Sequence, residues 1–396
     1  MVCRRLFCAQ GFLGALSFIS SAYAKIFVVV CYSMIFASMF FASIAFGQTP
    51  VTAPTKPSAG ASNAGNPPAT APTPASELPV SQPPVSKHDD DDHLALMHLI
   101  ESLEPYHAKG SIKGSMVVSG STTMQSMARA WLDRFIKFHP EVSYTKGQEG
   151  TDAAIKEISD NPQVIAGASR PLTEQELNNL KSSKCKEPMA VIVALDPLAL
   201  YVHKENPLAS VTPEQLESIF RAAGSGKPHA LKWGDLGLTG EWAGQPIRIH
   251  GRSDVSGTTG FIKQWILGGG ELAKAAQIHE TNIAVTQGVG KDKFGVALCG
   301  FGDHNADVRA VPLVLQGIAV EASEENFLAG RYPFVRPLML IVDQATLRSD
   351  GGLRESILRY VLSRDGQLEA IRAGFFPLDP AFIRKQLDLI SGPQVR

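Results

Sequence analysis

The chain has 396 residues, of which 44% are hydrophobic and 19% are charged. At roughly 100–200 residues per domain, this length allows two domains and further segments, and the composition is sufficient to build packed cores. The formal net charge is −1 and the pI is about 6.8. No basic surplus is available to hold nucleic acid, so we expect no nucleic-acid partner.

Residues 1–47 carry two apolar runs behind a short basic start. The second run, over 26–46, is long enough to span a bilayer as a helix, which needs about 20 apolar residues. It ends in a small-x-small pattern at Ala45 and Gly47, which signal peptidase accepts. We therefore expect residues 1–47 to be an export signal or an uncleaved membrane anchor, with the protein in the periplasm or at the cell surface.

Residues 48–87 are dominated by proline, alanine, serine and threonine, a composition that predicts a disordered spacer. The letters HDDDDH follow, and they suggest either a metal site or the start of a helix. We favour a helix, because aspartates stabilise the positive end of a helix dipole. A spacing of five also fails to put His88, His93 and His98 on one side of a helix. Residues 48–111 are thus expected to be a spacer that ends in a short acidic helix.

From residue 112 onward, short apolar runs that indicate strands alternate with amphipathic segments that indicate helices. Helix signals include a capping box from Thr173 to Glu176 and a proline at the first helical position, Pro213. This alternation predicts an α/β fold with mostly parallel sheets. We expect strands within 112–118, 141–147, 164–168, 189–207, 245–254, 294–303, 308–315 and 336–344, with the chain after residue 344 helical.

Cys185 and Cys299 are the two cysteines that follow the apolar N-terminal segment. Their spacing is not that of metal ligands. Two interpretations stay open: one disulfide formed in an oxidising compartment, or two separate core residues, which is the commoner role of an isolated cysteine.

Four turns that follow predicted strands carry hydroxyl side chains, at residues 119–123, 150–152, 168–170 and 256–259. Ligands of open α/β sheets collect at the carboxyl ends of strands, and helix N-termini there offer unpaired N–H groups. Helix capping explains any one of these turns. Four of them, with Arg252 beside one, favour a site for a small anion if the fold brings them together.

Seven segments occur in an order that resembles the phosphate-binding protein of the bacterial phosphate ABC importer, a family of type II periplasmic substrate-binding proteins. The resemblance covers residues 112–396 and implies two α/β lobes joined by two crossovers. Lobe 1 would comprise 112–195 and 336–396, and lobe 2 would comprise 196–335. The segments are VVSGSTTMQSMARAWLDRF, QEGTDAAIKEI, IAGASRPLTEQEL, VTPEQLESIF, IRIHGRSDVSGTTGFIKQWIL, FGVALCGFGD and YPFVRPLMLIV.

The resemblance also implies that hydroxyl and backbone N–H donors from both lobes surround one phosphate. It makes Arg252 the charged donor and Asp254 its ion-pair partner. The implied ligand-binding residues are Ser121, Thr122, Thr123, Thr151, Ser169, Arg252, Asp254, Ser256, Gly257 and Thr258, with Gly150, Asp152 and Arg170 at the edge of the set.

Arg170 departs from those members of the family in which an aspartate accepts the proton of the bound phosphate. Such an aspartate rejects sulfate, because sulfate leaves its lone pair unpaired. Glu149 and Asp152 are candidate replacements, although an ordinary solvated or first-turn acid is the favoured interpretation of each. The sequence leaves open whether Arg170 points into the site, and whether the ligand is phosphate or another oxyanion such as sulfate.

We therefore expect a non-catalytic, monomeric protein that clamps inorganic phosphate and delivers it to the permease subunits of an ABC importer, without cofactor or metal. A phosphate-responsive sensor or surface scaffold, held by a membrane tether at the N-terminus, is the alternative. An enzyme is disfavoured, because a hydrolase needs a metal cluster or an activated nucleophile. Near Ser256, the sequence offers only His250 as a base.

Overall fold

The computed structural model describes residues 90–108, 110–224, 226, 229–254, 256–275 and 277–392. The expected export signal or anchor and the Pro-rich spacer lie outside the described residues. Within the described ranges, no helix combines the length and the apolar character needed to cross a bilayer.

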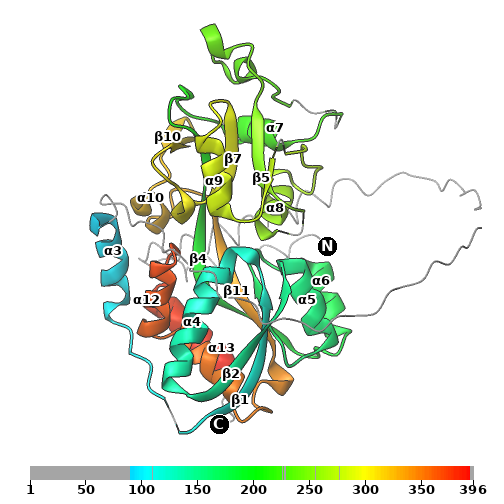
Figure 1. The fold of residues 1–396 in the computed structure, drawn as a ribbon, viewed down its shortest axis with the longest axis vertical. Helices are drawn as coiled ribbons and strands as arrows, with labels where there is room; N and C mark the ends of the chain where they lie inside the picture. The colour runs from blue at the N-terminus through cyan, green and yellow to red at the C-terminus, as the bar shows by residue number, and fades with distance from the viewer. Residues whose placement is uncertain are drawn as a thin grey trace, which may run out of the picture.

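Among the described residues, nine strands form one mixed sheet that extends through both lobes (Figure 1). Its order is β2-β1-β3-β11-β4-β7-β5-β6, and β8 also pairs with β4. The strands are β1 (Lys113–Gly120), β2 (Glu141–Glu149), β3 (Ile165–Ala168), β4 (Pro188–His203), β5 (Arg248–Arg252), β6 (Gln277–His279), β7 (Gly295–Gly300), β8 (Val308–Val311) and β11 (Val335–Asp343), and β9 (Leu313–Leu315) and β10 (Ile318–Val320) form a separate hairpin.

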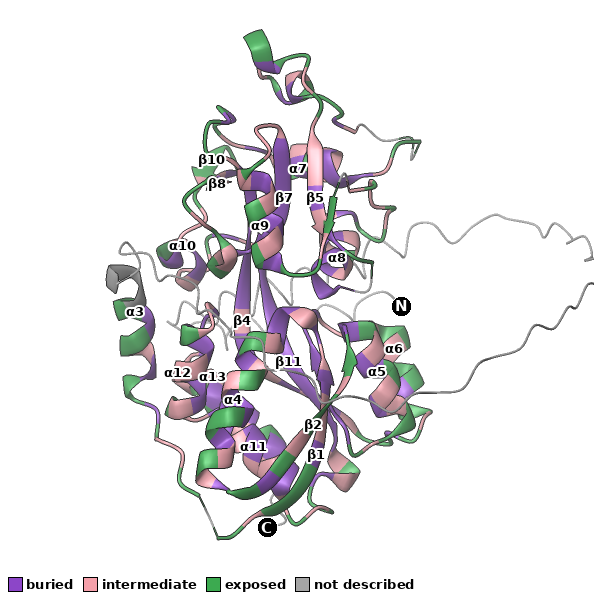
Figure 2. Ribbon diagram, in the orientation of Figure 1, coloured by how far each residue is buried: buried purple, intermediate pink, exposed green. Residues whose placement is uncertain are grey.

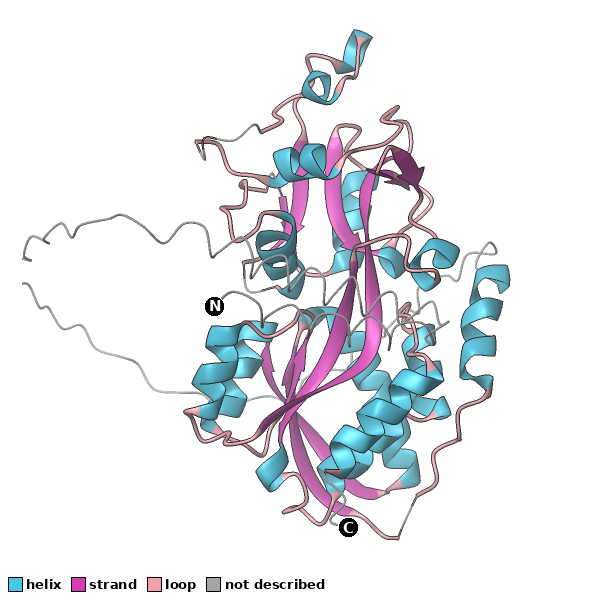
Figure 3. Cartoon of the chain, turned by 180° about the vertical axis from the view of Figure 1, so that it is seen from behind, coloured by secondary structure: helices cyan, strands magenta, loops and turns pink. Residues whose placement is uncertain are grey.

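The long strands β4 and β11 connect the two lobes (Figure 3). They pair antiparallel from Val335 opposite Pro197 to Asp343 opposite Pro188, and β4 continues beyond this ladder to pair with β7. We call the end with β1, β2 and β3 lobe 1, and the end with β5 to β10 lobe 2. Figure 2 shows that β11 and most of β4 are buried where they cross between the lobes.

The strand directions correct one expectation. Pairing is parallel between β1 and its neighbours β2 and β3, and between β5 and its neighbours β6 and β7. At the centre of the sheet it is antiparallel, between β11 and β3, β11 and β4, and β4 and β7. The prediction of mostly parallel sheets is therefore wrong at the centre, because the chain enters lobe 2 on one crossing strand and returns on the other.

Helices cover the sheet of lobe 1 on both faces (Figure 1). In α4, Met127, Trp131 and Phe135 are buried at helical spacing, as the sequence predicts. The capping box at the start of α6 is present, with Thr173 and Glu176 each bonding the other's backbone. The helices of lobe 1 are α4 (Gln125–Phe138), α5 (Thr151–Asp160), α6 (Glu174–Lys181), α11 (Leu353–Val361), α12 (Arg364–Arg372) and α13 (Pro380–Ser391).

Lobe 2 contains short elements that the sequence did not predict: β6, β10, α9 and α10. Helix α9 includes two glycines, Gly288 and Gly290, and glycine lowers helix propensity by about 1 kcal/mol relative to alanine. Its helical state depends on packing, since Val285 and Val289 are buried in a cluster with residues of β4 and β7. The helices of lobe 2 are α7 (Pro213–Phe220), α8 (Gly257–Phe261), which continues as a π-helix (Ile262–Ile266), α9 (Asn282–Gly290) and α10 (Glu324–Leu328).

The expected helix ahead of the folded part is present as α3 (Asp90–Glu101), and it packs against α12. Leu96 and Ile100 are buried in the main core, so this helix is amphipathic rather than solvated all round. The following segment is fixed by Tyr106, whose hydroxyl lies 2.8 Å from His139 Nε2 and whose backbone N–H donates to Asp365. The folded part thus begins ahead of residue 112.

The two cysteines are free thiols buried in separate clusters. Cys185 packs with Leu180 and Met339 in lobe 1, whereas Cys299 packs with Tyr201 in lobe 2. The disulfide interpretation is therefore wrong, and the core interpretation is correct for both residues.

Candidate functional site

The three hydroxyl turns of lobe 1 meet at the carboxyl ends of the parallel strands. Ser121 follows β1, Ser169 follows β3, and Thr151 begins α5. The Ser121 and Ser169 hydroxyl oxygens lie 2.7 Å apart, and the Ser169 backbone N–H is directed at Thr151 Oγ1 at 3.4 Å. All three residues are buried. This convergence follows from the parallel pairing of β1 with β2 and β3, which places the ends of neighbouring strands at one edge of the sheet.

The fourth turn, from lobe 2, packs directly against these residues. Ser256 caps α8 by accepting a hydrogen bond from Thr258 N at 3.1 Å. A Cβ on Gly257 would overlap Ser169 Oγ and lie 3.1 Å from Thr151 Oγ1. Glycine is needed here because the start of α8 touches the turns of lobe 1, so hydroxyl and N–H donors from both lobes share one buried place.

Arg252, at the end of β5, joins the lobes at this place. It donates to Thr122 Oγ1 in lobe 1 (2.7 Å) and to Asn282 Oδ1 (2.9 Å) and the His279 carbonyl (3.1 Å) in lobe 2. Its side chain is buried, and this burial lowers the pKa of the guanidinium from its ordinary value. Arginine nevertheless stays charged at any physiological pH. A buried positive charge therefore lies beside the hydroxyl turns.

A second buried arginine, Arg336 on β11, also reaches the site. Its Nε and Nη2 donate to Asp196 Oδ2 on β4 at 2.9 and 2.7 Å, and Nη2 also donates to Thr258 Oγ1 at 3.0 Å. Among the described residues, its buried Nη1 has no hydrogen-bond partner. Sequence reasoning assigned Arg336 no role, although it stands in the quoted segment YPFVRPL. Thr123, which the resemblance did assign, lies at the edge of this cluster, with its hydroxyl 3.5 Å from Arg336 Nη2.

The expected ion pair between Arg252 and Asp254 is wrong. Asp254 lies two residues after Arg252, its side chain is 83% exposed, and its Oδ1 pairs with Lys263 Nζ at 3.2 Å. Arg252 instead turns inward to neutral oxygen acceptors. The chain leaves β5 toward solvent after Arg252, and the carboxylate follows it outward.

Arg170, whose direction the sequence left open, is held at the edge of the site. It donates to Asp152 Oδ1 (2.6 Å) and to both oxygens of Glu176 (2.8 and 2.6 Å), while its aliphatic part lies where a side chain on Gly260 of α8 would contact it. Gly150, also at the edge, caps α5 with a φ of 99°, a conformation that favours glycine. Asp152, one of the two candidate proton acceptors, thus already accepts a hydrogen bond from Arg170.

The other candidate acceptor, Glu149, bonds Gln125 at 3.0 Å and pairs with Lys146. Lys146 lowers the pKa of Glu149 from its ordinary value. Its side chain is half exposed. The Glu149 carboxylate thus bonds other side chains at the surface of lobe 1, and its role as a proton acceptor in the site is not supported.

His250, the residue that kept a hydrolase interpretation open, is turned to other partners. Its Nδ1 lies 3.1 Å from His279 Nε2, and its Nε2 lies 3.1 Å from Asp292 Oδ2. Ser256 meanwhile accepts from the backbone of Thr258. This arrangement does not pair the serine with the histidine as an activated nucleophile requires.

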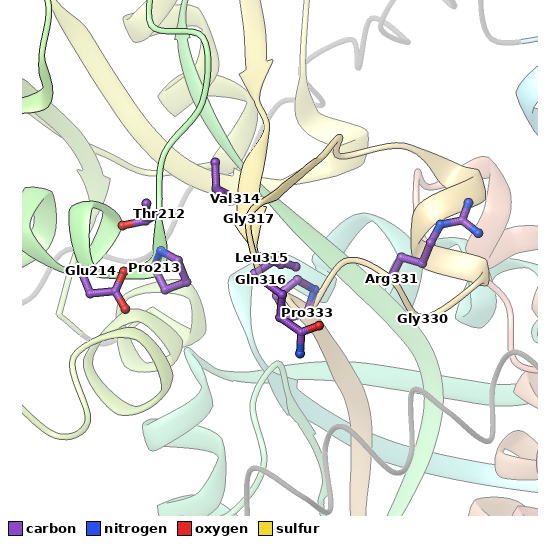
Figure 4. A pocket seen from close by; sticks show the side chains of 10 residues that line it. All are labelled: Thr212, Pro213, Glu214, Val314, Leu315, Gln316, Gly317, Gly330, Arg331 and Pro333. Atoms are coloured by element: carbon purple, nitrogen blue, oxygen red, sulfur yellow. The ribbon is translucent and has the colours of Figure 1, made fainter.

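A surface pocket of about 640 Å³ lies elsewhere on lobe 2 (Figure 4). It is bounded by the start of α7, the turn between β9 and β10, and residues 330–333. None of the predicted site residues lines it. We therefore do not associate this pocket with the hydroxyl turns.

A fold of two α/β lobes with a candidate site between them is typical of substrate-binding proteins. A family model described as the PBP superfamily domain matches residues 106–364, and the chain belongs to this superfamily. Together with the relatives given next, this match confirms the resemblance seen in the sequence and the two-lobed α/β fold class.

Individual relatives and solved structures are similar to this chain over most of their length. The chain is 32% identical over 291 residues to the phosphate-binding protein PstS of Pseudomonas aeruginosa, covering 72% of this chain and 90% of that protein. Among solved structures, an ABC-type phosphate transport receptor from Vibrio cholerae aligns with a TM-score of 0.55 at 20% identity, over 67% of this chain and 100% of that chain. A possible phosphate binding protein from Planctomyces limnophilus aligns with a TM-score of 0.54 at 23% identity, over 71% and 99%. These two likenesses support the fold.

Proposed function

We propose that this chain is an exported substrate-binding protein that clamps inorganic phosphate between its lobes and delivers it to an ABC importer. The observation that carries the proposal is the meeting of Ser121, Ser169 and the start of α8 beside Arg252. The similarity to the Pseudomonas aeruginosa phosphate-binding protein supports phosphate as the ligand.

The chemistry of the site suits a small, highly charged anion. Phosphate at neutral pH carries about −1.5 to −2 charges and several acceptor oxygens. Hydroxyl groups, helix N-terminal N–H groups and one or two arginines can replace its water shell without a strongly basic protein. The near-zero net charge of the chain is consistent with such local neutralisation.

Ligand entry requires the lobes to separate. Gly257 touches Ser169, and Arg252 already bonds Thr122 across the lobes. Phosphate would take the place of the Arg252–Thr122 and Ser121–Ser169 hydrogen bonds, with its oxygens accepting from the groups that now bond one another. The crossing strands β4 and β11 are the covalent links about which such a hinge motion would occur.

The proposal also covers the oligomeric state, the location and the partner of the protein. We infer a monomer outside the cytoplasm, with the N-terminal segment as signal or tether and the importer's permease as partner. Binding without catalysis is the inferred activity, since His250 is paired away from Ser256. A phosphate-responsive sensor would use the same clamp and differ only in its partner.

Calorimetric titration with phosphate and with sulfate tests the function. We expect saturable one-to-one phosphate binding at both pH 6 and pH 8, and weaker binding of sulfate. Preference for sulfate would make the chain a binder of another oxyanion. Absence of binding to both anions would remove the proposed function.

A further inference from the structure

A second carboxylate lies behind the site, and no part of the proposed function accounts for it. Asp303 ends a short 3-10 helix (Phe301–Asp303) directly after β7. A Cβ on Gly300 would collide with Asp303 Oδ2 and lie 3.2 Å from Asp196 Oδ1. The two carboxylates therefore face the same small space, which only glycine leaves open.

Asp303 is connected to Arg252 through one side chain. Asn282, the first residue of α9, is buried, and its Oδ1 accepts from Arg252 Nη1 at 2.9 Å. The Asn282 side chain also faces the Asp303 carboxyl and acts to lower its pKa. The Asp303 backbone is fixed as well, because the Thr286 hydroxyl of α9 donates to its carbonyl at 2.6 Å. The order Asp303–Asn282–Arg252–Thr122 thus runs from the back of lobe 2 to the hydroxyl turns of lobe 1.

Charged and titratable groups from four strands surround Asp303. They are the carboxylate of Asp196 and the phenol of Tyr201 on β4, the thiol of Cys299 on β7, and the guanidinium groups of Arg252 on β5 and Arg336 on β11. Asp196 is matched by Arg336 through two hydrogen bonds. With Asp303 ionised, the two arginines and two aspartates sum to zero, whereas with Asp303 protonated they sum to +1.

Two close carboxylates in a buried place compete for ionisation. Burial, followed by the charge of Asp196, raises the pKa of Asp303 to about 7, against the lowering effects of Asn282, Arg336 and Arg252. The Asp303 carboxyl therefore holds its proton to a much higher pH than an ordinary aspartate does. Its proton decides whether the region behind the hydroxyl turns is neutral or positive.

We propose that Asp303 is a positioning residue for Arg252 and that its protonation controls the anion affinity of the site. The inference rests on the proposed function. Without an anion, the ionised Asp303 balances Arg252. A bound anion supplies that negative charge itself and favours the proton on Asp303, so binding takes up a proton and weakens as the pH rises through 7.

The test is the phosphate affinity of Asp303→Asn at pH 6 and pH 8, relative to the unchanged protein. The ligand's own titration affects both proteins equally and cancels in the ratio. We expect near-equal affinities at pH 6 and binding by Asp303→Asn up to about tenfold tighter at pH 8, since asparagine is neutral at both. Asp307→Asn is the matched control. Asp307 lies only four residues after Asp303, but it is exposed and pairs with Lys204 at the surface. The ratio of its phosphate affinity to that of the unchanged protein should stay near one at both pH values.

A second measurement needs no variant. The Asp303 carboxyl of ¹³C-labelled protein should titrate near neutral pH, and saturation with phosphate should move its pKa upward. An unchanged pKa, or an affinity ratio that is the same at both pH values, would overturn the inference while leaving phosphate binding intact. If the unchanged protein fails to bind phosphate, the proposed function fails instead.

Discussion

Arg252 has a different kind of neighbourhood from an ordinary buried arginine. Its contacts are the Thr122 hydroxyl, the Asn282 amide oxygen and the His279 carbonyl, all neutral. A buried guanidinium without a direct carboxylate partner keeps its positive charge available to a ligand. Arg336 differs, because Asp196 already neutralises it.

Replacing Arg252 by alanine should weaken phosphate binding at least tenfold, since the loss of a buried charged donor costs about 2–5 kcal/mol. Calorimetry measures the change. Arg331→Ala is the matched control, because Arg331 is half exposed and pairs with Glu325 on the surface of lobe 2. Equal phosphate affinity in Arg252→Ala and the unchanged protein would remove Arg252 from the site.

Replacing Arg336 by methionine should lower the free energy of unfolding by about 3–5 kcal/mol. The reason is that Asp196, 2% exposed, is left as a buried carboxylate without its partner. Urea denaturation measures the loss. The double variant Arg336→Met with Asp196→Asn should recover much of it, because no unpaired charge remains. Equal losses in the single and the double variant would contradict this account.

At the scale of elements, the start of α8 is where the lobes touch. Gly257→Ala should reduce phosphate affinity at least tenfold, because the added methyl group overlaps Ser169 Oγ in the closed arrangement. The separate lobes should fold normally, so the far-ultraviolet circular dichroism should be unchanged. Gly244→Ala is the control, since its Cβ would meet no atom within 4 Å. Undiminished phosphate binding by Gly257→Ala would show that the bound state is more open than this structure.

At the scale of the whole molecule, the proposal assigns phosphate binding to the two lobes and gives residues 1–87 no part in it. Removing residues 1–87 should leave phosphate affinity unchanged, as calorimetry can show. Removing 1–108 should lower the melting temperature, because the buried side chains of Leu96, Ile100 and Leu103 are lost from the core. A large affinity loss from the shorter truncation would make the spacer part of the binding unit.

The sequence by itself determined the local features of the protein. Capping boxes, the apolar spacing in α4 and the hydroxyl turns after strands are set by residues a few positions apart, so they can be read directly. The resemblance supplied the lobes and most of the donors that the structure brings together, such as Ser121, Ser169 and Thr258.

Only the tertiary structure decided which charged groups meet. Arg252 bonds Thr122, 130 residues away, rather than Asp254, and Arg336 joins Asp196 across 140 residues. Asp303 faces Asp196 because β7 lies beside β4. Helix α9, which positions Asn282, has little helical signal of its own. Contacts of this kind depend on the antiparallel crossing of β4 and β11, and local sequence spacing contains no information about partners so far apart.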